Sequence, residues 1–318
     1  MREIIIGKND AGQRIDKFLT KKYKSLPQSM MYKLIRKKKI TLNRKRVHED
    51  AVLSEGDRIL VFAPDDLFCD SAKRDIPVSR SDICVVYEDE NVLIVDKPSG
   101  LLVHSDEAES RDTLIDRIHS YLYKKGEYDP AQEQSFAPSL CNRIDRNTQG
   151  LVIAAKNAAA LRSMNVIIRE RHIEKTYLAT VHGLLEAAQG TISLFLEKDP
   201  KTNTVRVKKE RVNSETKTAV TEYKTVSVSA DKAYSLLEIK LVTGRTHQIR
   251  ASFAHIGHPL LGDGKYAVNK ADRALGFSSQ ALCSYSVTFK GIPANDLLSY
   301  LNGKTFYAGK PDFHKLFK

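Results

Sequence analysis

The chain has 318 residues, of which 42% are hydrophobic and 28% charged, and its formal net charge is +12. Such a chain is long enough for two or three domains, and its composition excludes a disordered or membrane-embedded protein. Its apolar runs, such as 151–155, are far shorter than a membrane span, and residues 4–6 are too short for a secretory signal. We therefore expect a cytoplasmic protein with no membrane partner.

The positive charge is concentrated at the start of the chain. Residues 1–64 hold 16 Lys and Arg against 7 Asp and Glu, whereas the remaining residues hold 35 against 32. Clustered cations favour a polyanion, most simply nucleic acid, because phosphate binding releases condensed counterions. An anionic membrane surface would compete, but no amphipathic helix with an exposed aromatic face supports it.

Residues 1–64 are predicted to form one small α/β module. Apolar residues recur at helical spacing over 15–23, with basic residues elsewhere around the helix. Pro27 then breaks the chain, and Ser29 is a plausible N-cap for a second helix. The strands expected after it are 40–42 and 59–62, with a basic turn at 43–46 between them.

This module resembles the S-four-like RNA-binding domain, which is named for a ribosomal protein. The matching stretches are 14–19, 33–43 and 54–57. The resemblance implies that the module grips structured RNA through eight basic residues: Lys33, Arg36, Lys37, Lys38, Lys39, Arg44, Lys45 and Arg46. The alternative is a basic face that is merely solvated.

Residues 65–81 are polar and irregular, which predicts a linker that lets the module move relative to the rest of the chain. In residues 82–318 helices and strands are interspersed without a regular βαβ alternation. We therefore expect an α+β fold, with a mixed, mainly antiparallel sheet and flanking helices. The expected helices are 113–123 and 157–171, and the expected strands are 83–87, 92–95, 151–155, 174–181, 191–197, 203–209, 216–228 and 233–242.

One carboxylate, Asp145, stands in a polar turn directly before the apolar run 151–155. It lies between Arg143 and Arg146, and neighbouring cations favour the ionised form of a carboxylate. Asp145 is therefore a candidate nucleophile or base. The alternative is a surface carboxylate that is only paired with nearby arginines.

A second polar stretch follows the strand expected at 233–242. Gly244 supplies a turn, and a helix is expected to begin near Thr246. A helix N-terminus suits a phosphate or carboxylate, and the candidate contacts here are Arg245, Thr246, His247 and Gln248. His247, His255 and His258 match no zinc motif, and the four scattered cysteines show no metal or redox spacing, so we expect no metal site.

Taken together, several stretches resemble the RluA-type RNA pseudouridine synthases in order and spacing. They are 87–91, 96–100, 142–145, 174–179, 244–250 and 255–263, and the resemblance covers about residues 82–290. A set of independent motifs in register is far more specific than any one of them alone. The basic module ahead of them is the usual partner domain of this family.

The resemblance implies roles for four residues. Asp145 is the catalytic aspartate, paired with Arg250. Tyr177 lines the pocket and accepts a proton from the uracil ring, and Arg143 fills the gap left when the target uridine leaves its stack. In one place the chain departs from the family pattern, because position 142 is Asn where the family usually has His; Asn still donates and accepts hydrogen bonds.

We therefore predict a cofactor-free, monomeric isomerase that converts uridine to pseudouridine in structured RNA, with large-subunit ribosomal RNA as the expected substrate. Transfer RNA is the alternative substrate. Two rivals belong to other classes. One is a non-enzymatic RNA-binding or ribosome-assembly factor, which only Asn142 supports. The other is a ribonuclease that uses His247 and His255.

Overall fold

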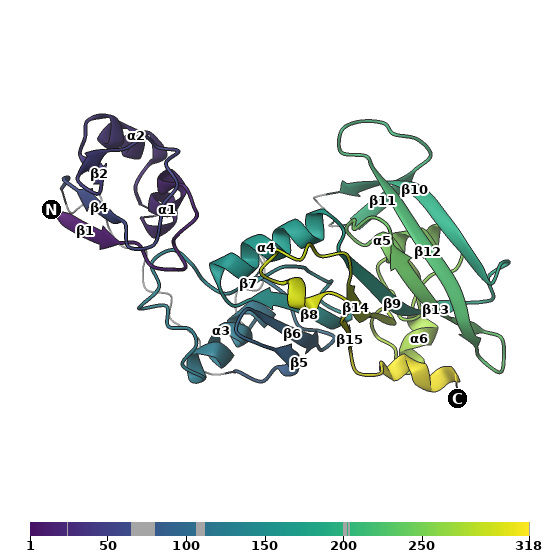
Figure 1. The fold of residues 1–318 in the computed structure, drawn as a ribbon. Coiled ribbons are helices and arrows are strands. Elements are labelled where there is room, and N and C mark those ends of the chain that lie inside the picture. Colours follow the sequence, from purple (N-terminus) through teal and green to yellow (C-terminus); the bar gives the residue numbers. More distant parts are fainter. Residues whose placement is uncertain (24, 65–79, 106–111, 200–201, 203, 318) are drawn as a thin grey trace.

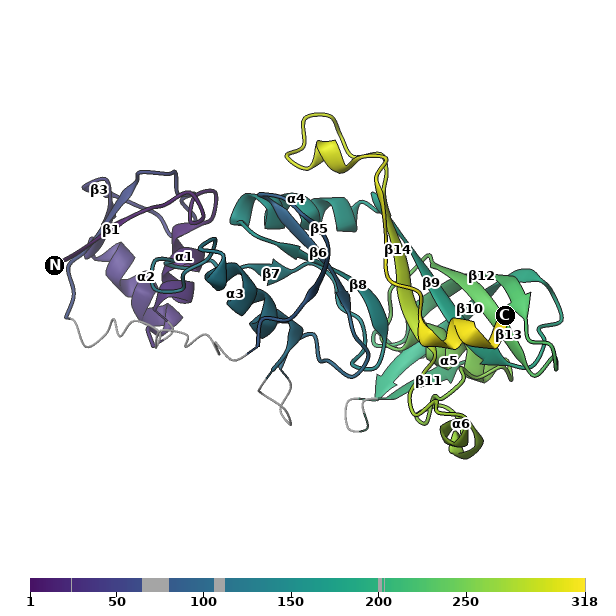
Figure 2. The same ribbon diagram turned by 90° about the horizontal axis from the view of Figure 1, so that it is seen from below.

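The structure is a computed structural model that describes residues 1–23, 25–64, 80–105, 112–199, 202 and 204–317. These residues form a four-stranded sheet near the N-terminus and an eleven-stranded sheet in the rest of the chain. The small sheet and its two helices lie at one end of the molecule, and β10 to β13 lie at the other (Figures 1 and 2). The predicted α+β class is confirmed. Most of the predicted linker, residues 65–79, lies outside the described residues.

The small N-terminal unit is an antiparallel sheet covered by two helices. Its elements are β1 (Arg2–Ile5), α1 (Ile15–Lys22), α2 (Gln28–Arg36), β2 (Ile40–Leu42), β3 (Lys45–Arg46) and β4 (Arg58–Val61), with strand order β1-β4-β2-β3. The apolar faces of α1 and α2 meet the sheet in one core that includes Phe18, Leu19 and Ile35. The second helix begins before Ser29, the N-cap we predicted, because Pro27 occupies the N-cap with φ −60° and no side chain caps the helix.

Polar contacts dock the N-terminal unit on the larger one. The Asn9 amide donates to Glu133 Oε1 at 2.9 Å, and the Gln13 amide donates to Ser135 Oγ at 2.9 Å. Ser135 in turn donates to the carboxylate of Asp10, which is only 2% exposed. Burial raises the pKa of Asp10 despite that hydrogen bond. These hydrogen bonds join the module to the segment that contains Glu133 and Ser135.

The larger unit is built on one long sheet. Its strands are β5 (Cys84–Glu88), β6 (Val92–Lys97), β7 (Ser139–Leu140), β8 (Gln149–Ala155), β9 (Ile173–His182), β10 (Gln189–Asp199), β11 (Thr204–Lys208), β12 (Lys217–Val228), β13 (Tyr234–Leu241), β14 (Leu282–Phe289) and β15 (Thr305–Tyr307). The main order is β11-β10-β12-β13-β9-β14-β8-β6-β5. The pairing of β8 with β14 is parallel, and the other described pairings are antiparallel.

Helices cover both faces of this sheet. They are α3 (Leu114–Lys124), α4 (Ala158–Arg169), α5 (Gln248–His255) and α6 (Lys270–Ala274), with 3-10 turns η2 (Ser299–Leu301) and η3 (Asp312–Phe317) near the C-terminus. The apolar face of α3 and Phe253 of α5 join one hydrophobic core, whereas Met164 and Ile167 of α4 join a second core. Side chains alternate along a strand, so β9 contributes Tyr177 to the first core and Leu178 to the second. Among the described residues, no helix is long and apolar enough to cross a membrane.

Strand β14, which we did not predict, brings distant segments together. Ser284 pairs with Gly150 of β8 on one side and with Tyr177 of β9 on the other. The contact with β8 is close, because a Cβ on Gly150 would lie 2.3 Å from the carbonyl oxygen of Ser284, and the φ of Gly150 is +118°. The turn that carries Asp145 enters the sheet at β8. Only β14 therefore separates β8, which follows this turn, from β9, which carries Tyr177.

Candidate active site

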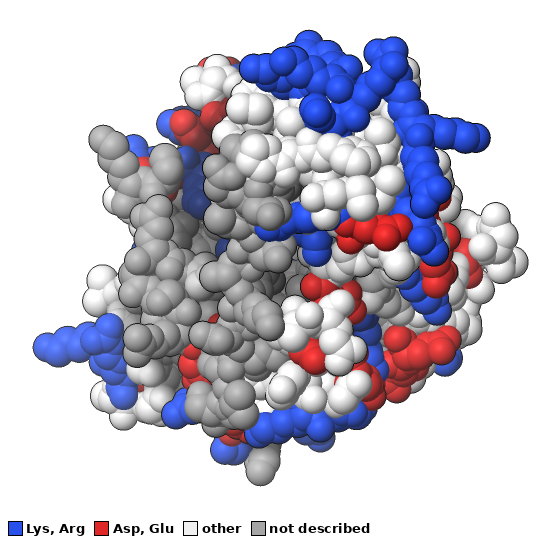
Figure 3. All heavy atoms as spheres, turned by 90° about the vertical axis from the view of Figure 1, so that its left-hand side faces the viewer, with Lys and Arg blue, Asp and Glu red and all other residues white. Residues whose placement is uncertain are grey.

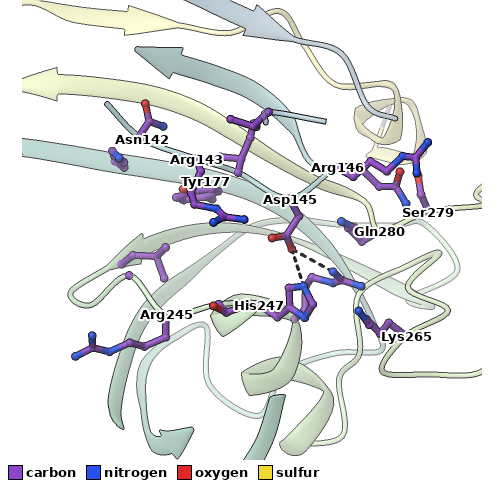
Figure 4. A pocket seen from close by; sticks show the side chains of 18 of the residues that line it. Asn142, Arg143, Asp145, Arg146, Tyr177, Arg245, His247, Lys265, Ser279 and Gln280 are labelled. Carbon is purple, nitrogen blue, oxygen red and sulfur yellow. Dashed lines mark hydrogen bonds and ion pairs between the residues drawn. The ribbon is translucent and has the colours of Figure 1, made fainter. Parts of the chain in front are cut away.

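A cleft of about 1170 Å³ opens where the turn before β8 faces β9 and the start of α5. This volume is ample for a nucleoside and its neighbours. The predicted residues on its wall are Arg143, Asp145, Tyr177, Arg245, Thr246, His247 and Arg250. Figure 4 shows Tyr177 and His247 on different sides of Asp145. Residues more than a hundred positions apart thus meet in one cavity.

Asp145 is held by a guanidinium group that is itself anchored. Arg250 Nη1 donates to Asp145 Oδ2 at 3.1 Å, while its Nε and Nη2 bond both oxygens of Asp263 at 2.7 and 2.8 Å. The Asp263 side chain is fully buried, whereas that of Asp145 is 29% exposed. Burial opposes charge here, yet the ion pair raises the pKa of Arg250 and lowers that of Asp263. A fixed cation therefore meets a carboxylate that substrate can still reach.

His247 is a second titratable side chain close to Asp145. Its Nε2 lies 3.7 Å from Asp145 Oδ2, and its Nδ1 lies 2.8 Å from the hydroxyl of Tyr266. Burial lowers the pKa of His247 to about 4, with Arg250 adding to the shift and Asp145 opposing it. The imidazole is therefore neutral near pH 7.

Tyr177 lies on strand β9 and lines the cleft. Strand β14 separates β9 from β8, the strand that follows the turn of Asp145. Its side chain is buried, and burial raises the pKa of its hydroxyl to about 12, against the effect of a hydrogen bond with Ser284. The phenol consequently keeps its proton near pH 7. Its ring can pack against a planar base beside Asp145.

The arginines next to Asp145 in sequence do not pair with it. The side chain of Arg146 is directed away from Asp145 and donates from Nε to the carbonyl of Gly100 at 3.1 Å (Figure 4). Arg143 is exposed on the wall of the cleft. The local pattern alone suggested these two neighbours as partners of Asp145, whereas the family resemblance implied Arg250. The structure places Arg250 beside Asp145, because successive residues of a turn point in different directions.

Asn142, the departure from the family pattern, ties the turn of Asp145 to the sheet. Its Oδ1 accepts from the backbone N–H of Ile153 at 2.8 Å, and its amide donates to the carbonyl of Leu151 at 3.4 Å. The side chain thus satisfies backbone groups of β8 beside Arg143. Asn at this position supports the geometry of the turn.

The segment before α5 contributes unequally to the cleft. Arg245 and Thr246 are exposed on its wall, and Arg245 also donates from Nε to the carbonyl of Thr218. Gln248, which we expected to contact substrate, is 2% exposed and does not reach the cleft. Its Oε1 accepts from the backbone N–H of Arg245 and its amide donates to the Val220 carbonyl, so it stabilises the turn.

Sequence reasoning missed Lys97, Asp263 and Tyr266. Lys97 is fully buried, and its ammonium donates to the carbonyls of Pro98, Leu101 and Arg146, each at 2.8 Å. It therefore fastens the end of β6 to the turn of Asp145. A lysine that ends the apolar strand 92–97 was the available signal, since a charged group in such a place needs partners.

The eight basic residues that the resemblance assigns to RNA binding are exposed. They are Lys33, Arg36, Lys37, Lys38, Lys39, Arg44, Lys45 and Arg46, called the basic patch below. They belong to α2, the β2–β3 hairpin and the loop between them. Lys and Arg side chains gather along the top and one edge of the end of the molecule shown in Figure 3. Elsewhere, the described residues contain no cluster of three or more His, Cys, Asp or Glu that could hold a metal ion.

Comparison with known proteins gives consistent matches. A sequence profile described as RNA pseudouridylate synthase matches residues 91–255. An "Uncharacterized RNA pseudouridine synthase" of Aquifex aeolicus is 31% identical over 289 residues, which cover 91% of this chain and 84% of that protein. "Ribosomal large subunit pseudouridine synthase C" of Buchnera aphidicola is 36% identical over 275 residues, covering 85% and 82%.

A solved structure shares the fold. "Human RNA Pseudouridylate Synthase Domain Containing 1" aligns with a TM-score of 0.57 and 22% identity, over 74% of this chain and 86% of that one. The profile spans about half of the chain, and the relatives cover most of it. The chain therefore belongs to the RNA pseudouridine synthase family, in its RluA-like group.

Proposed function

We propose that this pseudouridine synthase modifies specific uridines of large-subunit ribosomal RNA and that Asp145 is its reacting carboxylate. The single observation that carries the role of Asp145 is its placement. It is partly exposed in a cleft of nucleoside size, and the anchored Arg250 bonds its Oδ2. The substrate class is supported by relatives named as large-subunit ribosomal enzymes, at up to 36% identity.

The reaction needs little beyond a positioned carboxylate. It breaks the N–C glycosidic bond of uridine and rejoins the same base through carbon, so no outside atom or electron is required. A group that helps open the bond and then lets it close again is sufficient. The Arg250 guanidinium balances the negative charge of Asp145, and Asp263 fixes the guanidinium in turn.

Tyr177 is proposed to receive the proton that the base must lose at its new carbon bond. The phenol enters the reaction protonated because burial raises its pKa to about 12. It must therefore pass its own proton to N1 of the base, which has lost its bond to the sugar, as the proton from C5 arrives, and the hydrogen bond with Ser284 favours the phenolate form. Loss of one such acid–base group costs typically 10²- to 10⁴-fold in rate.

The RNA has to deliver an unstacked uridine to this cleft. Flipping a base out of a helix costs on the order of a few kcal/mol. We propose that Arg143, exposed beside the cleft, occupies the space that the base leaves. The basic patch, in an S-four-like unit spanning residues 1–64, would supply phosphate contacts that offset this cost.

The substrate proposal is tested by mapping pseudouridine. RNA from a strain that lacks the gene is incubated with the purified protein, and new pseudouridines are mapped in all RNA classes. We expect them in large-subunit ribosomal RNA. New pseudouridines confined to transfer RNA would refute the substrate and leave the chemistry standing.

The basic patch is tested by salt dependence. Replacing Lys37, Lys38 and Lys39 by Gln should weaken RNA binding and reduce the slope of log K against log salt by roughly 2–3, since each lost phosphate contact removes about 0.7–0.9. Lys224→Gln, an exposed lysine on β12, is the control and should leave the slope unchanged. An unaltered slope in the triple variant would show that the patch does not contact phosphate.

A further inference from the structure

The two oxygens of Asp145 have different surroundings. Arg250 Nη1 donates to Oδ2 at 3.1 Å, and His247 Nε2 lies 3.7 Å from the same oxygen, just beyond hydrogen-bond distance. Among the described residues, no side-chain hydrogen bond to Oδ1 accompanies the one to Oδ2. The nearest protein nitrogens thus lie on the side of one oxygen of a residue that lines the cleft.

The hydrogen bonds of Tyr266 determine which nitrogen of His247 carries the proton. The hydroxyl oxygen of Tyr266 accepts from the backbone N–H of Val205, at 2.9 Å. Burial raises the pKa of this phenol to about 12, so it keeps a proton that needs an acceptor. His247 Nδ1 lies 2.8 Å from the same oxygen. Nδ1 therefore accepts this proton, and a neutral ring must carry its own proton on Nε2.

We propose that Tyr266 is a positioning residue, whose hydroxyl holds His247 in the Nε2–H tautomer and so directs a second N–H donor at Asp145 Oδ2. Oδ1 is thereby left for the nucleoside. The inference rests on the proposed role of Asp145. It also gives His247 a different task from the RNA contact expected from its sequence motif, since its ring is 7% exposed and both nitrogens face protein groups.

The surroundings of His247 keep it neutral, as the proposal requires. Burial lowers its pKa to about 4, the cations of Arg250 and Lys265 act in the same direction, and the carboxylates of Asp145 and Asp263 oppose them. Because Nδ1 is an acceptor for Tyr266 and Nε2 is protonated, no nitrogen is free to act as a base toward RNA. This arrangement argues against the histidine-dependent ribonuclease.

The tautomer can be measured without RNA. Nitrogen-15 NMR of selectively labelled histidine, assigned with a His247 variant, distinguishes the two neutral tautomers. The wild-type ring should be in the Nε2–H form near pH 7, and Tyr266→Phe, which keeps the aromatic ring, should populate the Nδ1–H form as well. A wild-type ring mainly in the Nδ1–H form would overturn the proposal.

A matched pair of His247 variants distinguishes a role as hydrogen-bond donor to Asp145 from a purely conformational role of the residue at this backbone position. The φ of His247 is +49°, a conformation that Asn adopts more readily than Gln. The amide of Gln, however, extends to about the position of Nε2, whereas that of Asn ends near Nδ1. If His247 acts by donating to Asp145, His247→Gln should form pseudouridine at least about tenfold faster than His247→Asn. A purely structural role predicts the reverse order, and that result would overturn the proposal.

The measurement is single-turnover pseudouridine formation at saturating RNA, together with RNA affinity. Tyr266→Phe should slow the reaction about fivefold, the worth of one hydrogen bond, with an unchanged Kd for RNA. A wild-type rate in that variant would also count against the inference. Failure of the proposed function is distinguishable from failure of this inference. In the first case the wild-type protein forms no pseudouridine, and the NMR measurement still determines the tautomer of His247.

Discussion

Arg250→Lys is the substitution that the geometry of the site predicts to be least conservative. Arginine makes three charge-assisted hydrogen bonds here, two to Asp263 and one to Asp145. A lysine ammonium is a point charge that cannot bond both oxygens of Asp263 and also reach Asp145. At least two bonds are lost at about 1.5–3 kcal/mol each. We therefore expect a loss of about 3–6 kcal/mol in the free energy of unfolding.

The same change should slow catalysis, because Asp145 loses the group that fixes its position. We expect pseudouridine formation to fall about a hundredfold, the cost of a misplacement near 1 Å. Urea denaturation and a single-turnover assay measure the two effects. Arg245→Lys, at an exposed position on the same cleft, is the control and should change stability by less than about 0.5 kcal/mol. An Arg250→Lys protein with wild-type stability and rate would refute this account of the Asp263–Arg250–Asp145 chain.

Three further predictions concern stability, and denaturant titration checks each. Lys97→Met should cost about 3–5 kcal/mol because it strands three carbonyls that the ammonium now bonds, and a loss below about 1 kcal/mol would contradict this. Gly150→Ala should cost about 3 kcal/mol or more, since its Cβ would meet the Ser284 carbonyl at 2.3 Å; an unchanged midpoint would show that β8 and β14 can separate freely. His247 has a folded-state pKa of about 4, below the ordinary value of 6.5, so the unfolded chain binds its proton more tightly and stability falls as pH drops from about 6.5 toward 4. From about pH 7 to pH 5, wild type should lose about 2 kcal/mol more than His247→Gln, and parallel losses would refute the shift.

Local sequence patterns predicted most of the elements around the site. Helices α3 and α4 follow from apolar residues at helical spacing, and β9 follows from alternation along residues 173–182. The position of Asp145 before a buried strand was likewise evident. Such features depend on neighbours within a few residues, which is why a single sequence contains them.

Contacts between residues that are distant in the sequence could not be predicted from local patterns. The charge partner of Asp145 comes from α5, 105 residues away. No local pattern distinguishes it from the adjacent Arg143 and Arg146, and only the family resemblance pointed to it. Strand β14 owes its place to parallel pairing with β8 at Gly150, which depends on the close approach of two backbones. Gln248 was expected to contact substrate because it lies at a helix N-terminus, but its hydrogen bonds within the turn allow it to be buried.

The most direct test of the central claim is Asp145→Asn, measured by pseudouridine formation in the RNA that the wild-type protein modifies. This change removes the negative charge and keeps the size of a side chain that is partly exposed. We expect no detectable pseudouridine, with the denaturation midpoint and RNA affinity close to those of wild type. Turnover at the wild-type rate would show that the reaction does not depend on this carboxylate.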